Sequence, residues 1–201
     1  MNERLRSAPA AERNKVPILA TLQEVLPRSG RLLEIASGFG QHALFLAEHL
    51  PDWTLVPSDV ARDHVNTIDA WRGTHPLANL EAPRVIDVEK LPWPTSERFD
   101  VVLNINMIHI SPWSAALALF DGARDVLRPG GLLITYGPYR LGGEHTAPTN
   151  AAFDERLRSM DPRFGIRDLE ALDELASTRD LTPNDRFAMP ANNFLLTFER
   201  A

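Results

Sequence analysis

The sequence predicts a doubly wound α/β fold with seven mostly parallel strands, helices on both faces and an antiparallel hairpin at the C-terminal end. Three observations support this prediction. Short apolar runs alternate regularly with segments in which apolar residues recur every three or four positions. A glycine turn, residues 36–40, connects the first strand to a helix. The last two apolar runs are joined by residues 190–193, too few for a helical crossover, so these strands should be antiparallel.

The composition fits one globular domain. The 201 residues are 44% hydrophobic and 24% charged, which is ordinary for a soluble protein. A net charge of -6 without a lysine- or arginine-rich block argues against a nucleic-acid substrate. No run approaches the ~18 apolar residues of a membrane span and the N-terminus has no apolar signal region, so we expect a cytoplasmic protein with no membrane partner. The absence of cysteine excludes disulfides, thiolate metal sites and a cysteine nucleophile. The oligomeric state stays open.

The N-terminal part should contain a helix that precedes the first strand. We expect a single domain over residues 1–201 that begins with a loose polar arm, residues 1–12. Helical spacing of apolar residues predicts a helix from Arg13 to Leu26, with Pro17 tolerated in its first turn. The Pro-Arg-Ser-Gly sequence at residues 27–30 should end this helix.

The stretch LLEIASGFGQHALFLAEHL, residues 32–50, predicts a strand, a tight turn and a helix. Glycines let the backbone turn sharply and approach a ligand, while the helix start adds free N–H groups and a positive dipole end. Such a unit binds nucleotides or nucleosides, so the turn alone does not name the function. Gln41 could reach a ligand, and we expect His42 to lie at the surface or near the helix cap.

The second predicted strand, Thr54–Val60, carries Asp59 nineteen residues after Gly40. A carboxylate there is placed to accept hydrogen bonds from ribose hydroxyls. Alternatively, Ser58 or Asp59 caps the next helix, Ala61 to about Trp71, and the two roles can coexist.

Two further strands also end in polar residues. The third, Arg84–Val88, carries Asp87, which could accept the exocyclic amine of adenine or simply form a turn. The fourth, Phe99–Leu103, is continuously apolar, as expected at the centre of a parallel sheet. Residues 104–110 follow it and should reach the ligand crevice of an open α/β sheet.

The second half continues the alternation and then interrupts it. A helix, a strand and a later helix are expected over residues 111–127, 132–136 and 168–178. Residues 137–165 contain no predicted strand and one helix, Ala151–Met160; a segment this long usually forms a lid or a substrate loop. The final antiparallel strands should span residues 186–189 and 194–198.

Several of these segments resemble class I S-adenosylmethionine-dependent methyltransferases. LLEIASGFG resembles the first motif of that class, FDVVLNINMIHI its fourth motif and VLRPGGLLITY the entry to its fifth strand. The resemblance implies a Rossmann-like fold and S-adenosylmethionine as cofactor, with S-adenosylhomocysteine as product. Ala36 stands where the common pattern has its first glycine. Because alanine tolerates a positive φ poorly, we expect an ordinary φ at Ala36 and left-handed positions at Gly38 or Gly40.

A narrower resemblance is to the methyltransferase-like DUF938 (UPF0585) family, which includes methyltransferase-like protein 26. The segments AERNKVPIL, GGEHTAPTNAAFDERLR, FGIRDLE and MPANN carry it, over residues 8–200. It implies a fold and a cofactor but no particular substrate.

The resemblance implies a set of cofactor contacts. Glu34 should face the amino group of the cofactor, directly or through water, or else be a buried glutamate satisfied by the N–H groups of the turn. Arg13 could pair with the methionine carboxylate, or belong to a solvated helix start. The expected cofactor residues are Arg13, Asn14, Glu34, Ala36, Ser37, Gly38, Gly40, Asp59, Asp87, Val88 and Asn104.

Candidates for catalysis and substrate binding lie in the second half. His109 is a candidate general base because a neutral imidazole is available near pH 7, and a structural histidine is the alternative. Tyr139 could orient the substrate or merely pack. The expected substrate contacts are Asn106, Tyr136, His145, Asn150, Asp154 and Arg167. No metal motif is present.

Three functions remain open from the sequence. The first is methyl transfer to an unidentified, small-molecule acceptor. The second is S-adenosylmethionine binding for regulation, without turnover. The third is a nicotinamide-dependent oxidoreductase, which needs a G-x-G-x-x-G turn; here Ala43 stands at the last position and the terminal hairpin argues against it.

Overall fold

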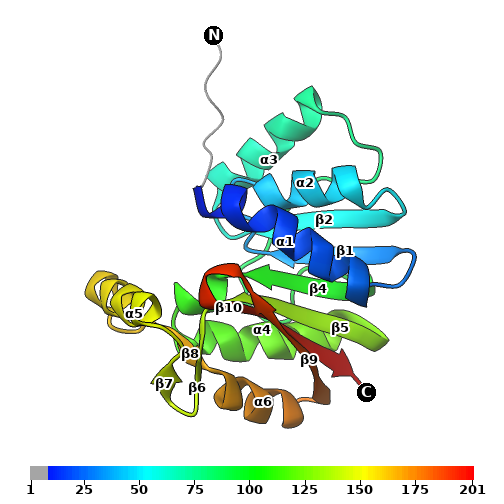
Figure 1. The fold of residues 1–201 in the computed structure, drawn as a ribbon. Helices are drawn as coiled ribbons and strands as arrows, with labels where there is room; N and C mark the ends of the chain where they lie inside the picture. Colours follow the sequence, from blue (N-terminus) through cyan, green and yellow to red (C-terminus); the bar gives the residue numbers. More distant parts are fainter. Residues whose placement is uncertain (1–8) are drawn as a thin grey trace. The chain divides into compact units, whose positions relative to one another are not determined.

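The computed structural model describes residues 9–201 (Figure 1). These residues divide into two compact units, residues 9–87 and 88–201. Most of the predicted polar arm, residues 1–8, lies outside the described residues, and the remaining arm residues belong to a helix. A single domain over the whole chain stays a prediction.

The first unit consists of three parallel strands and three helices. Its elements are α1 (Pro9–Val25), β1 (Gly30–Ile35), α2 (Gln41–His49), β2 (Trp53–Asp59), α3 (Arg62–Thr74) and β3 (Arg84–Val85). The strands lie in the order β3-β2-β1. Both β1 and β2 are buried along most of their length, as their apolar sequences require in a parallel sheet covered on both faces.

Two predicted boundaries in this unit are wrong. The first helix begins at Pro9 rather than Arg13, so Pro17 lies inside it. Proline removes one backbone hydrogen bond there, and burial of the helix face that carries Ile18 and Leu22 offsets the loss. The third strand ends at Val85, so Asp87 follows the strand instead of lying within it.

The second unit continues the parallel sheet pattern and ends in the predicted hairpin. Its larger sheet has the order β4-β5-β10-β9, built from β4 (Phe99–Ile105), β5 (Leu127–Gly137), β9 (Leu181–Met189) and β10 (Asn193–Arg200). β4 and β5 are parallel, whereas β10 is antiparallel to both of its neighbours. The antiparallel hairpin, coloured red at the C-terminal end of the chain, is therefore confirmed (Figure 1).

The second unit also contains three longer helices and two short ones. They are the short helix η1 (Met107–His109), α4 (Trp113–Val126), α5 (Pro148–Met160), α6 (Leu169–Ser177) and the short helix η2 (Pro190–Asn192). The core of the unit includes Phe120 and Phe198, whose rings meet edge to face at 5.0 Å. Trp93 occupies the space beside Gly122, where a Cβ would lie 2.3 Å from the indole ring.

The expectation of no strands within residues 137–165 is wrong. A small sheet, in the order β7-β6-β8, contains β6 (Tyr139–Leu141), β7 (Glu144–His145) and β8 (Arg167–Asp168). Gly142 and Gly143 both have positive φ, 59° and 82°, which is what a two-residue hairpin turn with the correct twist requires. The Gly-Gly dipeptide was the sequence signal for this hairpin.

The predicted fold class is confirmed. The strands form an α/β structure with a seven-stranded, mostly parallel sheet, and helices occur between successive strands in both units. The carboxyl ends of the parallel strands carry the turn at residues 36–40, Asp59 and residues 104–110.

Candidate functional site

The glycine turn after β1 contains three residues with positive φ. Gly38 and Gly40 have φ of 56° and 81°, as predicted. Ala36 has φ of 61°, so the prediction of an ordinary φ at this position is wrong. The turn requires the left-handed conformation at its first residue as well, which costs an alanine about 1–2 kcal/mol because its Cβ approaches the following carbonyl.

Hydrogen bonds to the end of β2 hold the turn in this conformation. The Ser37 N–H donates to the Ser58 carbonyl at 2.8 Å, and the Ser58 N–H donates to the Ser37 hydroxyl at 3.2 Å. The Ser58 hydroxyl donates to the Glu34 carbonyl at 2.7 Å. These bonds connect the ends of two parallel strands, and they offset the backbone strain at Ala36.

Glu34 is a buried acid at the end of β1. Glu34 is 3% exposed, and its side-chain oxygen Oε2 has no hydrogen-bond partner among residues 9–201. Burial raises the pKa of Glu34 to about 7, the Ser37 hydroxyl opposes this shift, and the nearby Asp59 carboxylate reinforces it. The alternative in which the N–H groups of the turn satisfy Glu34 does not account for this oxygen.

Asp59 ends β2 and contacts the turn directly. One carboxylate oxygen accepts the N–H of Gly38 at 2.9 Å, and the other accepts the N–H of Ala61 at 2.9 Å. Nδ1 of His64 lies 3.0 Å from the second oxygen. The N-cap of α3 is Ala61, so the alternative in which Ser58 or Asp59 is the capping residue is wrong. A carboxylate can accept about four hydrogen bonds, so lone pairs remain for ribose hydroxyls.

The two predicted cofactor residues of α1 differ in burial. Asn14 is buried, and its side-chain oxygen lies 2.8 Å from Nε2 of His42 in α2. His42 is therefore a buried residue of the contact between α1 and α2, so the expected surface position is wrong, although His42 does lie next to the helix cap, two residues after Gly40. Gln41 donates to Glu12 at 3.0 Å across the same contact. Arg13 is exposed.

The turn in the first unit has open space and a buried acid beside it. A Cβ added to Gly38 would meet no atom within 4 Å in the described part of the chain, so the turn leaves open space beside its backbone. The buried oxygen of Glu34 can accept a hydrogen bond from a cationic amino group. Asp87, which is half-buried, follows β3 by two residues.

The second unit has its own buried polar group at the end of the parallel strands. His109, in η1, is 1% exposed, and neither ring nitrogen has a hydrogen-bond partner among the residues that the structure describes. Burial lowers the pKa of His109 to about 3, and the charge of Arg167 lowers it further. The imidazole is therefore neutral throughout the physiological range, with one lone pair available.

Two residues of β5 and β6 enclose the His109 ring. A Cβ on Gly137 would lie 2.4 Å from Nε2, so only glycine fits at the end of β5. The Tyr139 ring meets the imidazole edge to face at 5.0 Å. Sequence reasoning missed Gly137 as part of this site, and the glycine directly after Tyr136 was the signal that could have found it.

Tyr139 is fully buried and supports the site from behind. Its hydroxyl donates to the Thr135 hydroxyl at 2.9 Å, and burial raises the pKa of the phenol above its usual value. Tyr139 thus packs against His109, while its catalytic role stays a prediction. Asn104, at the end of β4, and Tyr136, near the end of β5, are also buried. Asn106 has a φ of 65° and joins β4 to η1.

The predicted substrate residues of the lid segment make contacts within the chain. The Asp154 carboxylate accepts the N–H of Ile166 at 2.6 Å, and Nε2 of His145 lies 3.5 Å from it. Burial alone would raise the pKa of Asp154, but the N–H of Ile166 and the Arg158 guanidinium outweigh burial and lower it. Asn150 donates to the Asn192 carbonyl at 3.0 Å.

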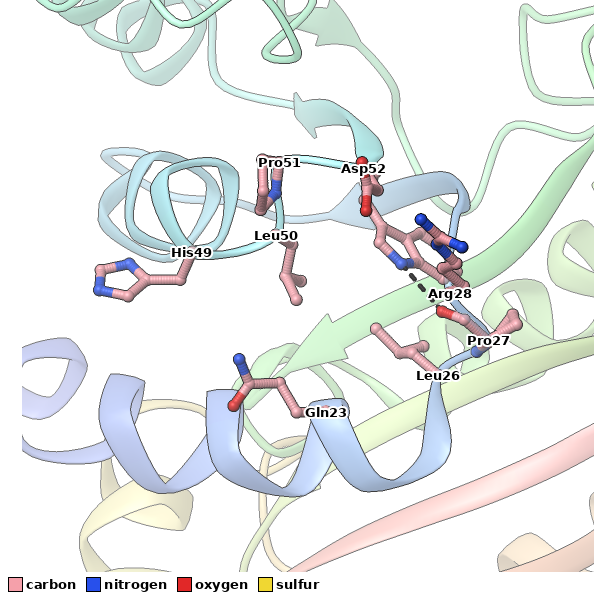
Figure 2. A pocket seen from close by; sticks show the side chains of 9 residues that line it. Gln23, Leu26, Pro27, Arg28, His49, Leu50, Pro51 and Asp52 are labelled. Atoms are coloured by element: carbon pink, nitrogen blue, oxygen red, sulfur yellow. Dashed lines mark hydrogen bonds between the residues drawn. The ribbon is translucent and has the colours of Figure 1, made fainter.

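A surface pocket of about 250 Å³ lies at the other end of the strands in the first unit (Figure 2). The indole of Trp53 donates to the Pro27 carbonyl at its edge, marked by the dashed line, and Arg28, His49 and Asp52 line it. Trp53 begins β2, whereas Asp59 ends it, so this pocket lies at the amino ends of the strands and contains none of the predicted site residues.

Within residues 9–201, no group of three or more histidine or acidic side chains is arranged to hold a metal ion. No helix in the same range is long and apolar enough to cross a membrane.

A family model and several solved structures match this chain. The model described as "Protein of unknown function (DUF938)" matches residues 5–200. The mitomycin 7-O-methyltransferase MmcR matches with a TM-score of 0.80 and 14% identity, over 96% of this chain and 54% of that protein. An O-methyltransferase family 2 protein from Planctomyces limnophilus, solved with apigenin, gives 0.77 and 20%, over 96% and 60%. The S-adenosylmethionine-dependent methyltransferase SibL gives 0.79 and 19%, over 95% and 55%.

These similarities establish the fold. Identities of 14–20% with TM-scores near 0.8 show that the chain shares the Rossmann-like class I methyltransferase fold. The chain spans little more than half the length of these three proteins, from 54% to 60%. Fold alone does not identify a reaction, so the function has to be argued from the residues at the strand ends.

Proposed function

We propose that this chain, which belongs to the DUF938 family, is an S-adenosylmethionine-dependent methyltransferase that acts on a small molecule. The fold supports this function, and the similar structures include proteins named as O-methyltransferases, which favours a hydroxyl group as the acceptor. The segments that resemble UPF0585 proteins support placing the chain with methyltransferase-like protein 26.

The single observation that carries the proposal is the oxygen of Glu34 that has no hydrogen-bond partner in the described part of the chain, beside an open glycine turn. S-adenosylmethionine carries a cationic amino group, and a buried carboxylate is a suitable partner for it. In a dinucleotide site the same turn faces the pyrophosphate, which is an anion. A buried carboxylate next to the turn would repel that anion, so Glu34 favours the sulfur-containing cofactor over a nicotinamide dinucleotide.

The first unit would bind the cofactor through named groups. Bound S-adenosylmethionine would supply a methyl group that an acceptor nucleophile attacks in line, with the sulfur leaving as the thioether of S-adenosylhomocysteine. Glu34 would accept a hydrogen bond from the amino group, and Asp59 would accept the ribose hydroxyls with the lone pairs left after its bonds to Gly38 and Ala61. Arg13 and Asp87 remain proposed contacts of the cofactor in this unit, whereas Val88 and Asn104, which belong to the second unit, stay predictions.

The second unit would hold the acceptor through His109. The neutral imidazole has no partner within the described residues, so its lone pair can accept a hydrogen bond from an acceptor hydroxyl. As the new carbon–oxygen bond forms and the carbon–sulfur bond breaks, the hydroxyl proton is released to water. Because burial disfavours the imidazolium, His109 is suited to orient the hydroxyl rather than to store its proton.

Ligand binding tests the proposal. We expect S-adenosylmethionine and S-adenosylhomocysteine to raise the melting temperature, and isothermal titration to give a dissociation constant for each, because both ligands bind only the folded state. Stabilisation by NAD but by neither sulfur ligand would overturn the proposal. Binding without methyl transfer to phenols, carboxylates, amines or thiols would favour the second candidate, a regulatory S-adenosylmethionine-binding protein that retains the pocket.

The role of Asp59 can be tested separately. Asp59→Ala should weaken S-adenosylhomocysteine binding by roughly 1–3 kcal/mol, measured by titration calorimetry, because two ribose hydrogen bonds are lost. Since Asp59 also holds the N–H of Gly38, the 2′,3′-dideoxy analogue serves as the control ligand. The wild type should bind this analogue more weakly than the parent compound, whereas the variant should not distinguish the two. Discrimination by the variant would assign Asp59 to the turn alone.

A further inference from the structure

Three hydrogen bonds connect residues 165–167 to the turn that carries His109. The Gly165 N–H donates to the His109 carbonyl at 2.9 Å. The Arg167 side chain donates from Nε to the Ile108 carbonyl at 2.9 Å and from Nη2 to the Ser111 carbonyl at 2.6 Å. Three of the four carbonyls between residues 108 and 111 are therefore held from a segment more than fifty residues later in the chain.

The segment that supplies these bonds is itself held in place. The Ile166 N–H donates to the buried Asp154 carboxylate at 2.6 Å. In β8, Arg167 is the register partner of Tyr139 in β6, and the Tyr139 ring contacts the imidazole of His109. The Arg167 guanidinium also donates to the Arg163 carbonyl at 3.1 Å and lies 5.7 Å from the Trp113 ring. We call the hydrogen bonds from Gly165 and Arg167 to residues 108–111 the clamp. Pairing of β8 with β6 and the bond from Ile166 to Asp154 hold the segment that forms this clamp.

These contacts hold the backbone of His109 and pack its ring, with Gly137 against the Nε2 edge, while neither ring nitrogen has a hydrogen-bond partner among residues 9–201. The His109 carbonyl is bonded, Gly137 contacts the ring from one side, and Tyr139 contacts it edge to face. A buried polar group that is held this firmly without a partner costs free energy. Such a cost is expected where a group must keep a fixed direction for a ligand.

We propose that Arg167 is a positioning residue for His109, and that it acts by bridging the carbonyls of Ile108 and Ser111. This inference rests on the proposed function, because it assumes that His109 contacts the acceptor. Sequence reasoning placed Arg167 among the substrate contacts. In the structure its guanidinium donates to three backbone carbonyls of its own chain, so a structural clamp accounts for it better than an acidic substrate does.

The charge and the geometry of Arg167 can be separated by substitution. The positive charge of Arg167 adds to the effect of burial in lowering the pKa of His109. Arg167→Gln would therefore raise this pKa even if Arg167 had no positioning role. Arg167→Lys keeps the charge, but an ammonium group cannot bridge two carbonyls in the planar geometry of a guanidinium. Arg140→Gln is the matched control, because Arg140 belongs to the same small sheet and pairs with Asp168.

The experiment uses the full chain labelled with ¹⁵N-histidine, and compares the His109 ring and amide signals by NMR. We expect one narrow set of ring signals in the wild type and in Arg140→Gln, and a shifted or broadened set in both Arg167→Lys and Arg167→Gln. If Arg167→Gln does not fold, Arg167→Lys alone decides. Wild-type His109 signals in Arg167→Lys would overturn the proposal, whether or not Arg167→Gln changes them.

S-adenosylhomocysteine titration on the same samples separates this inference from the proposed function. We expect the Arg167 variants to bind this ligand as the wild type does, because the hydrogen bonds and the ring contact of Arg167 within residues 9–201 are with residues of the second unit. If the wild type itself fails to bind, the proposed function fails while the NMR result still reports on the clamp. If Arg167→Lys loses binding together with its His109 signals, Arg167 supports the whole fold, and the specific positioning role is overturned.

Discussion

The turn after β1 and the end of β5 each place a glycine near an ionisable side chain, but the two glycines are needed for different reasons. Gly38 has a positive φ, and a Cβ there would meet no described atom within 4 Å. At Gly137 a Cβ would lie 2.4 Å from the imidazole of His109. The first region therefore depends on backbone conformation and leaves space for a ligand, whereas the second depends on close packing around its own side chain.

The ionisable groups of the two regions respond to pH in opposite directions. Burial raises the pKa of Glu34 to about 7 from 4.5, so its contribution to stability is lost as the pH rises through that range. Burial lowers the pKa of His109 to about 3 from 6.5, so its contribution is lost as the pH falls below 6.5. An acid and a base are thus both kept in sites that disfavour their charged forms, at a cost that stability alone does not explain.

The largest expected effect comes from adding a methyl group to the packed region. Gly137→Ala should lower the free energy of unfolding by about 3 kcal/mol, the upper end of the range for overpacked cores, because the buried His109 ring has no space to move. Urea unfolding followed by circular dichroism measures this change. Gly38→Ala should cost only about 1 kcal/mol, since the added Cβ meets open space and pays only for the positive φ. Equal losses in the two variants would remove the distinction between the regions.

A second effect concerns the charge at Glu34. Glu34→Gln should stabilise the ligand-free protein at pH 8 by about 1–2 kcal/mol, because the wild type must bury a carboxylate that glutamine does not carry. At pH 5 the wild-type side chain is mostly protonated, and the gain should disappear. Urea unfolding at the two pH values tests this difference.

The same variant should bind S-adenosylhomocysteine about tenfold to a hundredfold more weakly at pH 8, because a charge-assisted hydrogen bond is lost. Gain of stability with loss of affinity would show that Glu34 is retained for binding. A variant that is less stable than the wild type at pH 8 would instead show that the strand needs the carboxylate.

The smallest expected effect is at Ala36. Ala36→Gly should raise the free energy of unfolding by about 0.5–1 kcal/mol, because glycine relieves the positive φ while adding some entropy to the unfolded chain. Ala70→Gly, at an exposed position of α3, is the control and should lose about 1 kcal/mol. If both variants lose stability, the hydrogen bonds of the turn do not hold Ala36 in the left-handed region.

Prediction from the sequence succeeded where the determining forces are local. Hydrophobic periodicity located the main strands and helices, and the short connection at residues 190–193 predicted the antiparallel hairpin. It failed at Ala36, because tertiary hydrogen bonds to Ser58 outweigh the preference of alanine for negative φ. It also missed β6 and β7, whose strands are too short to show an alternating pattern.

The predicted site residues also divide into those that local sequence features indicate and those whose contacts only the tertiary structure reveals. Asp59 was selected by its position at a strand end, since parallel strands place their carboxyl ends at one edge of a sheet, and Glu34 by the resemblance of LLEIASGFG to a methyltransferase motif. Asn14 and Arg167 were also selected, but their polar atoms contact His42 and backbone carbonyls that lie far away in the sequence. No local pattern reveals such pairings.

The sequence by itself determined where the main strands lie along the chain, the position of the glycine turn and the residue types at the strand ends, because periodicity and glycine act over a few residues. Only the tertiary structure decided which polar atoms stay without a partner. Arg167 donates a hydrogen bond to Ile108 across 59 residues, while Glu34 and His109 have buried polar atoms with no hydrogen-bond partner among residues 9–201. Burial and hydrogen bonding depend on neighbours that the fold brings together, and these neighbours determine which side chains remain available to a ligand.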